Sequence, residues 1–183
     1  MTRRQKDHHA HIISTGGTIE KSFNEQTGTL SSSETLLQEF INTQLRLPQT
    51  EISLHPLMLK DSLELSESDR RQIIALVRIL QEQNTPVIVV HGTDTMITTA
   101  RLCQKEIPNP KVPIIFTGAM RPIGVGISDA RQNLAEALLA SRLLEPAVHI
   151  VFHSQILRPE QTTKNYTTLT FEQMSTTPPD TKI

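Results

Sequence analysis

The stretch PVIVV at residues 86–90 runs directly into HGTDT at residues 91–95, and together they decide the fold. A run of β-branched residues without polar alternation is typical of a strand that is buried on both faces, as in the middle of a parallel sheet. The apolar spacing then changes to that of a helix over residues 94–106. A buried strand, a short polar loop and a helix in this order predict a βα unit.

The same alternation extends outward along most of the chain. The expected strands cover residues 11–14, 51–59, 86–90, 112–117 and 147–152, and the expected helices cover residues 35–45, 66–80, 94–106 and 128–144. Ser66 and Asp69 have the spacing of a capping box at the start of the second helix. The pattern predicts a single doubly wound α/β domain, in which a mostly parallel sheet has helices on both faces, as in three-layer flavodoxin-like and Rossmann-like folds.

The two ends of the chain depart from this pattern. We expect residues 1–10 to form an N-terminal leader, residues 11–172 the α/β domain, and residues 173–183 a C-terminal tail. Residues 154–183 are rich in threonine and include Pro178-Pro179, so loops and a tail are predicted there rather than regular elements.

The composition excludes several classes of protein. Among 183 residues, 18 are Lys or Arg and 19 are Asp or Glu, and only 3% are aromatic, which argues against nucleic-acid binding by charge or by base stacking. The single cysteine, Cys103, excludes an intrachain disulfide and fits a reducing compartment. No apolar stretch approaches the roughly 20 residues that span a membrane, and the N-terminus lacks the apolar core of a signal peptide. We therefore expect a cytoplasmic protein with no nucleic-acid or membrane partner.

Unusual polar clusters follow three of the predicted strands. They are the segments STGGTI at 14–19, KDS at 60–62 and HGTDT at 91–95. Ligands of doubly wound sheets bind beyond the carboxyl ends of the strands, so these clusters are candidate site residues. Each also has a structural interpretation: the glycines can form a simple turn, Thr93 or Asp94 can cap a helix, and a histidine that ends a buried strand is more often structural than a general base.

A hydroxyl nucleophile requires a partner that activates it, because a threonine hydroxyl is a poor nucleophile at neutral pH. Lys164, in the polar segment 162–165, can act as that base if burial leaves its amine neutral, although a lone lysine in a polar loop is usually solvated. The spacing of His8, His9 and His11 resembles that of metal ligands, but these residues lack supporting carboxylates or cysteines. We predict no metal site.

Four segments, in this order, resemble the bacterial-type L-asparaginase and glutaminase family. They are TGGTI at 15–19, HGTDT at 91–95, GAMRP at 118–122 and TKN at 163–165. The resemblance covers about residues 10–172 and corresponds to the N-terminal domain of the usual two-domain members, so this chain looks like a short, single-domain form.

The resemblance implies a chemistry and a set of site residues. Thr18 matches the nucleophile, and Thr93, Asp94 and Lys164 match the second catalytic group. The family would hydrolyse the side-chain amide of L-asparagine to L-aspartate and ammonia through an acyl-enzyme, without a metal or organic cofactor, and usually as a homodimer or homotetramer. The substrate-binding residues implied in the same way are Asp61, Ser62, Gly92, Ala119 and Phe23.

Two departures from the family pattern keep other functions open. Phe23 stands where the family carries a tyrosine in the loop after the nucleophile, and the resemblance leads us to expect no counterpart of the second domain that completes each site in two-domain members. The alternatives are a glutaminase-like subunit of an amidotransferase and a non-catalytic binder of asparagine or aspartate. Asparagine and glutamine differ by one methylene group, which changes the discrimination free energy by about 1–3 kcal/mol through the shape of the pocket. The sequence alone does not determine this preference.

Overall fold

A computed structural model describes residues 8–24, 26, 28–33, 35–124 and 126–174 of the chain. Residues 1–7 of the predicted leader and residues 175–183 of the predicted tail lie outside the described residues, as do positions 25, 27, 34 and 125. The division of the chain into leader, domain and tail stays a prediction.

The central sheet confirms the predicted fold class. Its strands are β1 (His8–Gly16), β4 (Thr50–Lys60), β5 (Val87–Val90), β6 (Ile114–Thr117), β7 (Val148–Phe152) and β8 (Gln155–Leu157). They are ordered β4-β1-β5-β6-β7-β8, and each neighbouring pair is parallel except β7 with β8. The three strands β5, β6 and β7 are buried along their whole length, as expected for a sheet that is covered on both faces.

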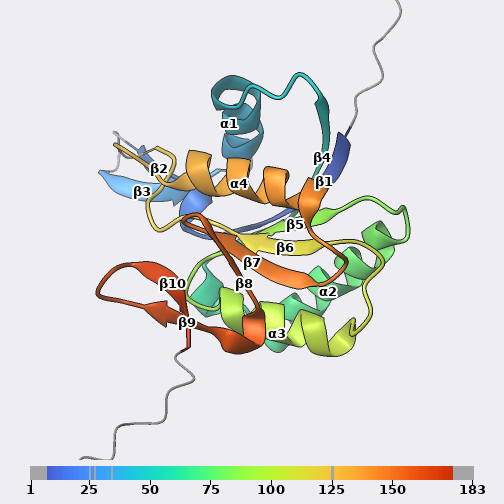
Figure 1. Ribbon diagram of the computed structural model, residues 1–183. Helices are drawn as coiled ribbons and strands as arrows, with labels where there is room; N and C mark the ends of the chain where they lie inside the picture. Colours follow the sequence, from blue (N-terminus) through green and yellow to red (C-terminus); the bar gives the residue numbers. More distant parts are fainter. Residues whose placement is uncertain (1–7, 25, 27, 34, 125, 175–183) are drawn as a thin grey trace, which may run out of the picture.

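Four α-helices form the outer layers. They are α1 (Leu36–Gln44), α2 (Glu67–Gln81), α3 (Met96–Glu106) and α4 (Ala130–Leu143). Helices α1 and α4 cover one face of the sheet, and α2 and α3 cover the other (Figure 1). Successive strand residues point to opposite faces, so Ile12 belongs to the core under α1 and α4, whereas Ile13 belongs to the core under α2 and α3.

The starts of two helices test the predicted caps. Ser66 and Asp69 form the expected capping box at the start of α2. The prediction that α3 begins at Asp94 was wrong: its N-cap is Thr95, and no side chain caps it. Asp94 is therefore not used to cap the helix, and its carboxylate is available for other contacts.

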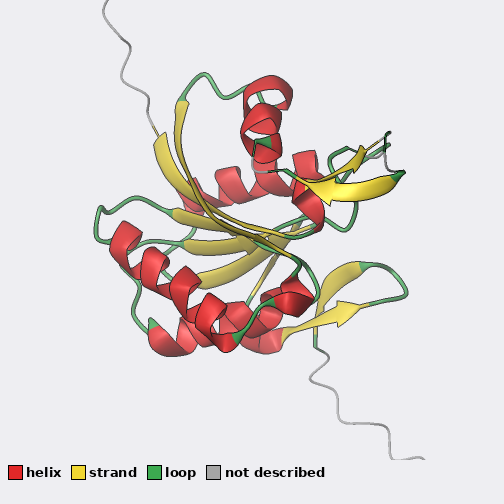
Figure 2. Ribbon diagram, turned by 180° about the vertical axis from the view of Figure 1, so that it is seen from behind, coloured by secondary structure: helices red, strands yellow, loops and turns green. Residues whose placement is uncertain are grey.

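Two β-hairpins and an edge strand were not predicted. The hairpins are β2 (Lys21–Asn24) with β3 (Thr29–Ser32), and β9 (Thr162–Asn165) with β10 (Thr170–Gln173). The expectation of only loops and tail after residue 154 was wrong, because β8, β9 and β10 lie there. Phe171 of β10 is fully buried, with its ring edge-on to Phe152 at 5.0 Å, and this anchors the second hairpin. Both hairpins extend from the same end of the sheet (Figures 1 and 2).

The first strand begins three residues earlier than predicted. His8 pairs with Thr50 in the β1–β4 ladder, so residues 8–10 of the predicted leader belong to the sheet. The imidazole of His9 is hydrogen-bonded to Ser53, and that of His11 to His55. Among the described residues no group of histidine, cysteine or acidic side chains is arranged to hold a metal ion, and no helix is long and apolar enough to cross a membrane. Short 3₁₀ helices cover Thr18–Glu20, Ser62–Glu64 and Pro159–Gln161.

Candidate functional site

The loops that follow β1 and β5 touch through two glycines. Gly17 has φ +83° and ψ −170°, a conformation that is essentially restricted to glycine. A Cβ on Gly17 would lie 2.5 Å from the Cα of Gly92, so neither backbone tolerates a side chain between them. Thr18 directly follows Gly17 in the first loop, and Thr93 directly follows Gly92 in the second. Since consecutive Cα atoms are about 3.8 Å apart, the glycine contact places the two threonines on adjacent loops, with Cα atoms no more than about 12 Å apart.

A third loop closes on the same point. A Cβ on Gly92 would lie 2.6 Å from the Cβ of Ser62, which begins the 3₁₀ helix after β4. The Ser62 side chain is buried, and its hydroxyl oxygen has no hydrogen-bond partner among the described residues. A buried hydroxyl without a partner costs free energy unless something binds it, so Ser62 is suited to hold a polar ligand.

The β9–β10 hairpin places Lys164 against the second of these loops. Its Nζ donates to Thr93 Oγ1 at 2.9 Å and to Asp94 Oδ1 at 2.7 Å. Only 9% of the Lys164 side chain is exposed, whereas 38% of the Asp94 side chain remains open to solvent. The structure thus brings together three of the four predicted catalytic residues, and the unused helix-cap position explains why Asp94 is free to pair with Lys164.

His91 is a structural residue. It is fully buried, and burial lowers the pKa of its imidazole to about 4, so the ring is neutral at physiological pH. The Gly92 carbonyl can only accept, so Nδ1–H donates to it at 2.8 Å, and Nε2 accepts from the Thr99 hydroxyl at 2.9 Å. Both ring nitrogens are engaged in hydrogen bonds within the fold, which favours the structural interpretation of this histidine.

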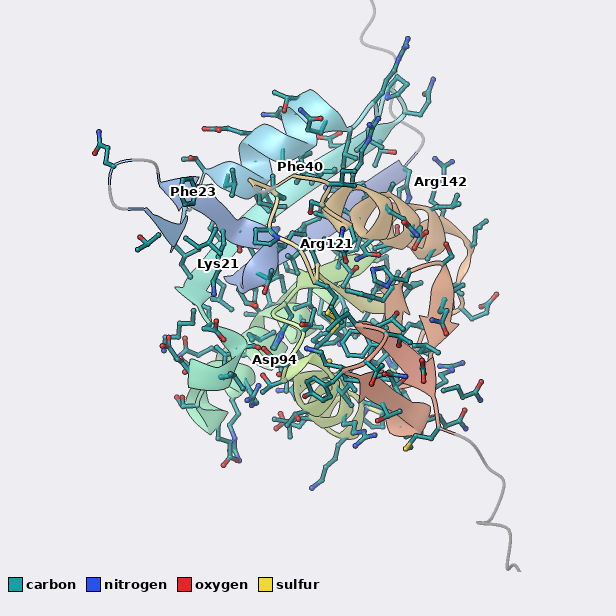
Figure 3. All side chains as sticks on the ribbon, turned by 90° about the vertical axis from the view of Figure 1, so that its left-hand side faces the viewer. Lys21, Phe23, Phe40, Asp94, Arg121 and Arg142 are labelled. Carbon is teal, nitrogen blue, oxygen red and sulfur yellow. The ribbon has the colours of Figure 1, made fainter. Side chains whose placement is uncertain are left out.

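The other predicted substrate-binding residues differ in how far they are exposed to solvent. Asp61 precedes Ser62, but its carboxylate already accepts from Lys21 Nζ at 2.9 Å, and this contact lowers the pKa of Asp61. Ala119 is buried after β6. Phe23 is 53% exposed on β2, and Figure 3 shows Lys21 between Phe23 and Asp94 in a view onto this end of the sheet.

Polar residues around the turn after β1 support the site, and among them the sequence did not single out Glu20. The buried carboxylate of Glu20 accepts from the Ser14 hydroxyl at 2.6 Å and from the Gly16 N–H at 2.8 Å, which fixes the turn before Thr18. The Thr15 hydroxyl donates to the Val90 carbonyl at 2.9 Å and ties the ends of β1 and β5 together. The position of Glu20 directly after the TGGTI segment was the one available hint.

The arrangement is suited to acyl transfer. It combines two threonines on adjacent loops, an ammonium group that donates to one of them, an accessible carboxylate and a buried, unpartnered hydroxyl. A positioned hydroxyl with an adjacent proton-transfer group is the arrangement that nucleophilic catalysis requires.

Comparison with known proteins identifies the family. A family model described as asparaginase, N-terminal, matches residues 9–180. The 60 kDa lysophospholipase of Mus musculus is 34% identical over 120 residues, which are 65% of this chain and 21% of that protein. L-asparaginase of Thermococcus kodakarensis is 29% identical over 148 residues, which are 80% of this chain and 44% of that protein.

The solved structure of the thermostable L-asparaginase from Thermococcus kodakarensis matches the fold with a TM-score of 0.78 at 24% identity. The match covers 90% of this chain and 51% of the solved chain. The chain spans less than half the length of both curated relatives. This chain therefore aligns with one part of each of these longer proteins.

Proposed function

The chain belongs to the asparaginase family, and from this premise we propose that it hydrolyses the side-chain amide of L-asparagine to L-aspartate and ammonia. The observation that supports the proposal most is the pair of hydrogen bonds from Lys164 Nζ to Thr93 Oγ1 and Asp94 Oδ1, made across about 70 residues of chain. A lysine of this polar segment has no packing reason to be buried against two acceptors, whereas proton transfer at Thr93 requires such a contact.

In the first step Thr18 is the nucleophile. Its oxygen forms a bond to the side-chain amide carbon, the carbon–nitrogen bond breaks, and ammonia leaves with the proton that the hydroxyl gave up. Backbone N–H groups beside Gly17 and Gly92 would stabilise the oxyanion of the tetrahedral intermediate, since both glycine turns allow close approach. The product of this step is an aspartyl ester of Thr18.

In the second step water replaces Thr18. Lys164 donates to the Thr93 oxygen, so the hydroxyl hydrogen of Thr93 is directed away from Lys164 and toward the substrate side. The oxygen of the attacking water bonds to the ester carbon, Thr93 accepts the water's proton while it passes its own hydrogen to the Thr18 oxygen, and the ester bond breaks to release aspartate. Lys164 holds the Thr93 oxygen in place during this relay. Asp94 holds the Lys164 ammonium between turnovers, with an oxygen 2.7 Å from Nζ.

The groups suited to bind the α-carboxylate and α-ammonium groups of the substrate are those that have a hydrogen-bonding atom still available. The unpartnered Ser62 hydroxyl is suited to the α-carboxylate, and the exposed part of the Asp94 carboxylate is suited to the α-ammonium group. Gly92, which has no side chain, and Ala119, which has only a methyl group, would line the substrate without obstructing it. The role of Asp61 in substrate binding stays a prediction, because Lys21 already neutralises its carboxylate.

The second candidate is a binder of asparagine or aspartate without turnover, which the missing phenol at Phe23 favours. Ammonia release after mixing the purified chain with L-asparagine, and in parallel with L-glutamine, separates the candidates. We expect steady ammonia release from L-asparagine. Calorimetric binding of L-aspartate without ammonia from either amide would establish the binder instead.

A further inference from the structure

Arg70, in the first turns of α2, lies behind the site and is half-buried. Its Nη1 donates to the Thr99 hydroxyl oxygen at 2.7 Å and to the Thr95 hydroxyl oxygen at 3.1 Å, and its Nη2 donates to the Leu65 carbonyl at 3.2 Å. A guanidinium group presents its N–H donors in a rigid fork, so one arginine holds three acceptors, two at the start of α3 and one in the loop before α2, in a fixed relation.

Two chains of hydrogen bonds lead from this guanidinium to the site. In the first, Thr95 accepts from Arg70 and its own hydroxyl donates to the Ser62 carbonyl at 2.7 Å. This contact holds the backbone of the residue that is suited to the substrate α-carboxylate. Because the Thr95 oxygen accepts a charge-assisted bond, its hydrogen is directed toward the Ser62 carbonyl.

The second chain runs through the buried histidine. Thr99 accepts from Arg70 and donates to His91 Nε2 at 2.9 Å, and His91 Nδ1–H donates to the Gly92 carbonyl at 2.8 Å. Gly92 is the residue that contacts both Gly17 and Ser62, and Thr93 follows it. The positive charge of Arg70 also helps to lower the pKa of His91, which keeps the ring in the neutral form that this chain needs.

We propose that Arg70 is a positioning residue that sets binding and turnover through separate hydroxyls: Thr95 fixes Ser62 for the substrate carboxylate, and Thr99 with His91 fixes Gly92 and Thr93 for the chemistry. The kinetic part of this inference rests on the proposed function. Its structural part, that Arg70 holds the loops 61–65 and 91–95, stands on the hydrogen bonds alone.

The test uses Arg70→Met, which keeps the aliphatic stem, and Arg71→Met as a matched control. Arg71 is the next residue of the same helix, but it is exposed and pairs with Glu67, one turn away on α2. We expect Arg70→Met to lower kcat/KM for L-asparagine by about tenfold to a hundredfold, the loss expected when site groups move by a fraction of an ångström to an ångström. Arg71→Met should stay within about twofold, since an exposed pair on one helix contributes little.

Two isosteric variants separate the branches. Thr95→Val should raise KM for L-asparagine and weaken L-aspartate binding with kcat nearly unchanged, whereas Thr99→Val should lower kcat with KM nearly unchanged. Arg70→Lys should recover part of the loss, because an ammonium can still donate to one hydroxyl at a time. A uniform fall of kcat without change in KM in both threonine variants would overturn the division of roles.

Hydrogen exchange gives a readout that does not depend on catalysis. Amides of residues 61–65 and 91–95 should exchange faster in Arg70→Met than in Arg71→Met, at matched global stability. Equal exchange in the two variants would overturn the inference even if the protein hydrolyses asparagine. If the wild type neither releases ammonia nor binds L-aspartate, the proposed function fails, and the exchange result alone decides whether Arg70 holds the loops.

Discussion

Replacing Gly17 with alanine tests the contact on which the site depends. At φ +83° and ψ −170° a Cβ costs about 1–3 kcal/mol in backbone strain alone. The new methyl carbon would also lie 2.5 Å from Gly92 Cα and 2.6 Å from Gly92 N, and forcing a group into so tight a contact costs about 1–3 kcal/mol more. Reduced freedom of the unfolded chain returns about 0.4–1 kcal/mol. We therefore expect the free energy of unfolding to fall by about 1–5.5 kcal/mol.

The same contact sets the expected loss of turnover. Ordinary contact begins near 3.4 Å, so a methyl carbon 2.5 Å from Gly92 must push the two loops about 1 Å apart. A displacement of about 1 Å between reacting groups reduces turnover by about a hundredfold. Thr18 and Thr93 flank this contact, so Gly17→Ala should lose about that factor in kcat/KM while the remaining protein is folded.

The matched control is Gly126→Ala. Gly126 also has a positive φ, +55°, but a Cβ there meets nothing within 4 Å. This variant should lose about 1 kcal/mol or less of stability and keep its turnover, since the strain of one left-handed alanine is partly offset in the unfolded chain. Urea unfolding and ammonia release on both variants complete the comparison. Normal turnover in Gly17→Ala would refute the claim that the β1 and β5 loops are held together by glycine contact.

Three further predictions concern the proton-transfer groups and pH. Lys164→Met should abolish ammonia release and leave the circular dichroism spectrum unchanged; persistent activity would show that the proton transfer at Thr93 does not depend on Lys164. Phe23→Tyr should raise the rate by about tenfold to a hundredfold, the lower range for a positioned proton-transfer group, and an unchanged or lower rate would mean that Phe23 does not occupy the position of the family tyrosine. Burial lowers the pKa of His91 to about 4 from the ordinary histidine value of 6.5, so the unfolded chain binds the proton more tightly. Its contribution to stability is complete above pH 6.5 and is lost as the pH falls toward 4, by about 3 kcal/mol in urea unfolding; an equally steep loss in His91→Gln would assign the effect to other groups.

The repeated βα units could be predicted because each strand and each helix has its own hydrophobic pattern in the local sequence. The β-branched run before His91 and the capping box at Ser66 are local signals, and both are present as expected. The hairpins were missed for the opposite reason. The segment around Phe171 is polar and threonine-rich, so it carries no hydrophobic pattern. Its hairpin is anchored by the burial of Phe171 against Phe152 at the end of β7, a contact between residues far apart in the sequence.

The candidate site was also predictable from the sequence only in part. The polar clusters at strand ends were visible, because the carboxyl ends of parallel strands meet at one edge. The contacts between Gly17, Gly92 and Ser62 join three loops and have no periodicity to reveal them. Lys164 was singled out by chemical need and by family resemblance, and Arg70 by neither, since a basic residue on a helix gives no sign of what its guanidinium reaches.

The most direct measurement of the proposed chemistry compares the wild type with Thr18→Ala. Ammonia and aspartate released from L-asparagine are measured for both proteins, together with L-aspartate binding and the circular dichroism spectrum. The wild type should release ammonia and aspartate in equal amounts, and Thr18→Ala should release neither while it remains folded and still binds L-aspartate through Ser62 and Asp94. Wild-type turnover that survives in a folded Thr18→Ala variant would contradict the assignment of Thr18 as the nucleophile.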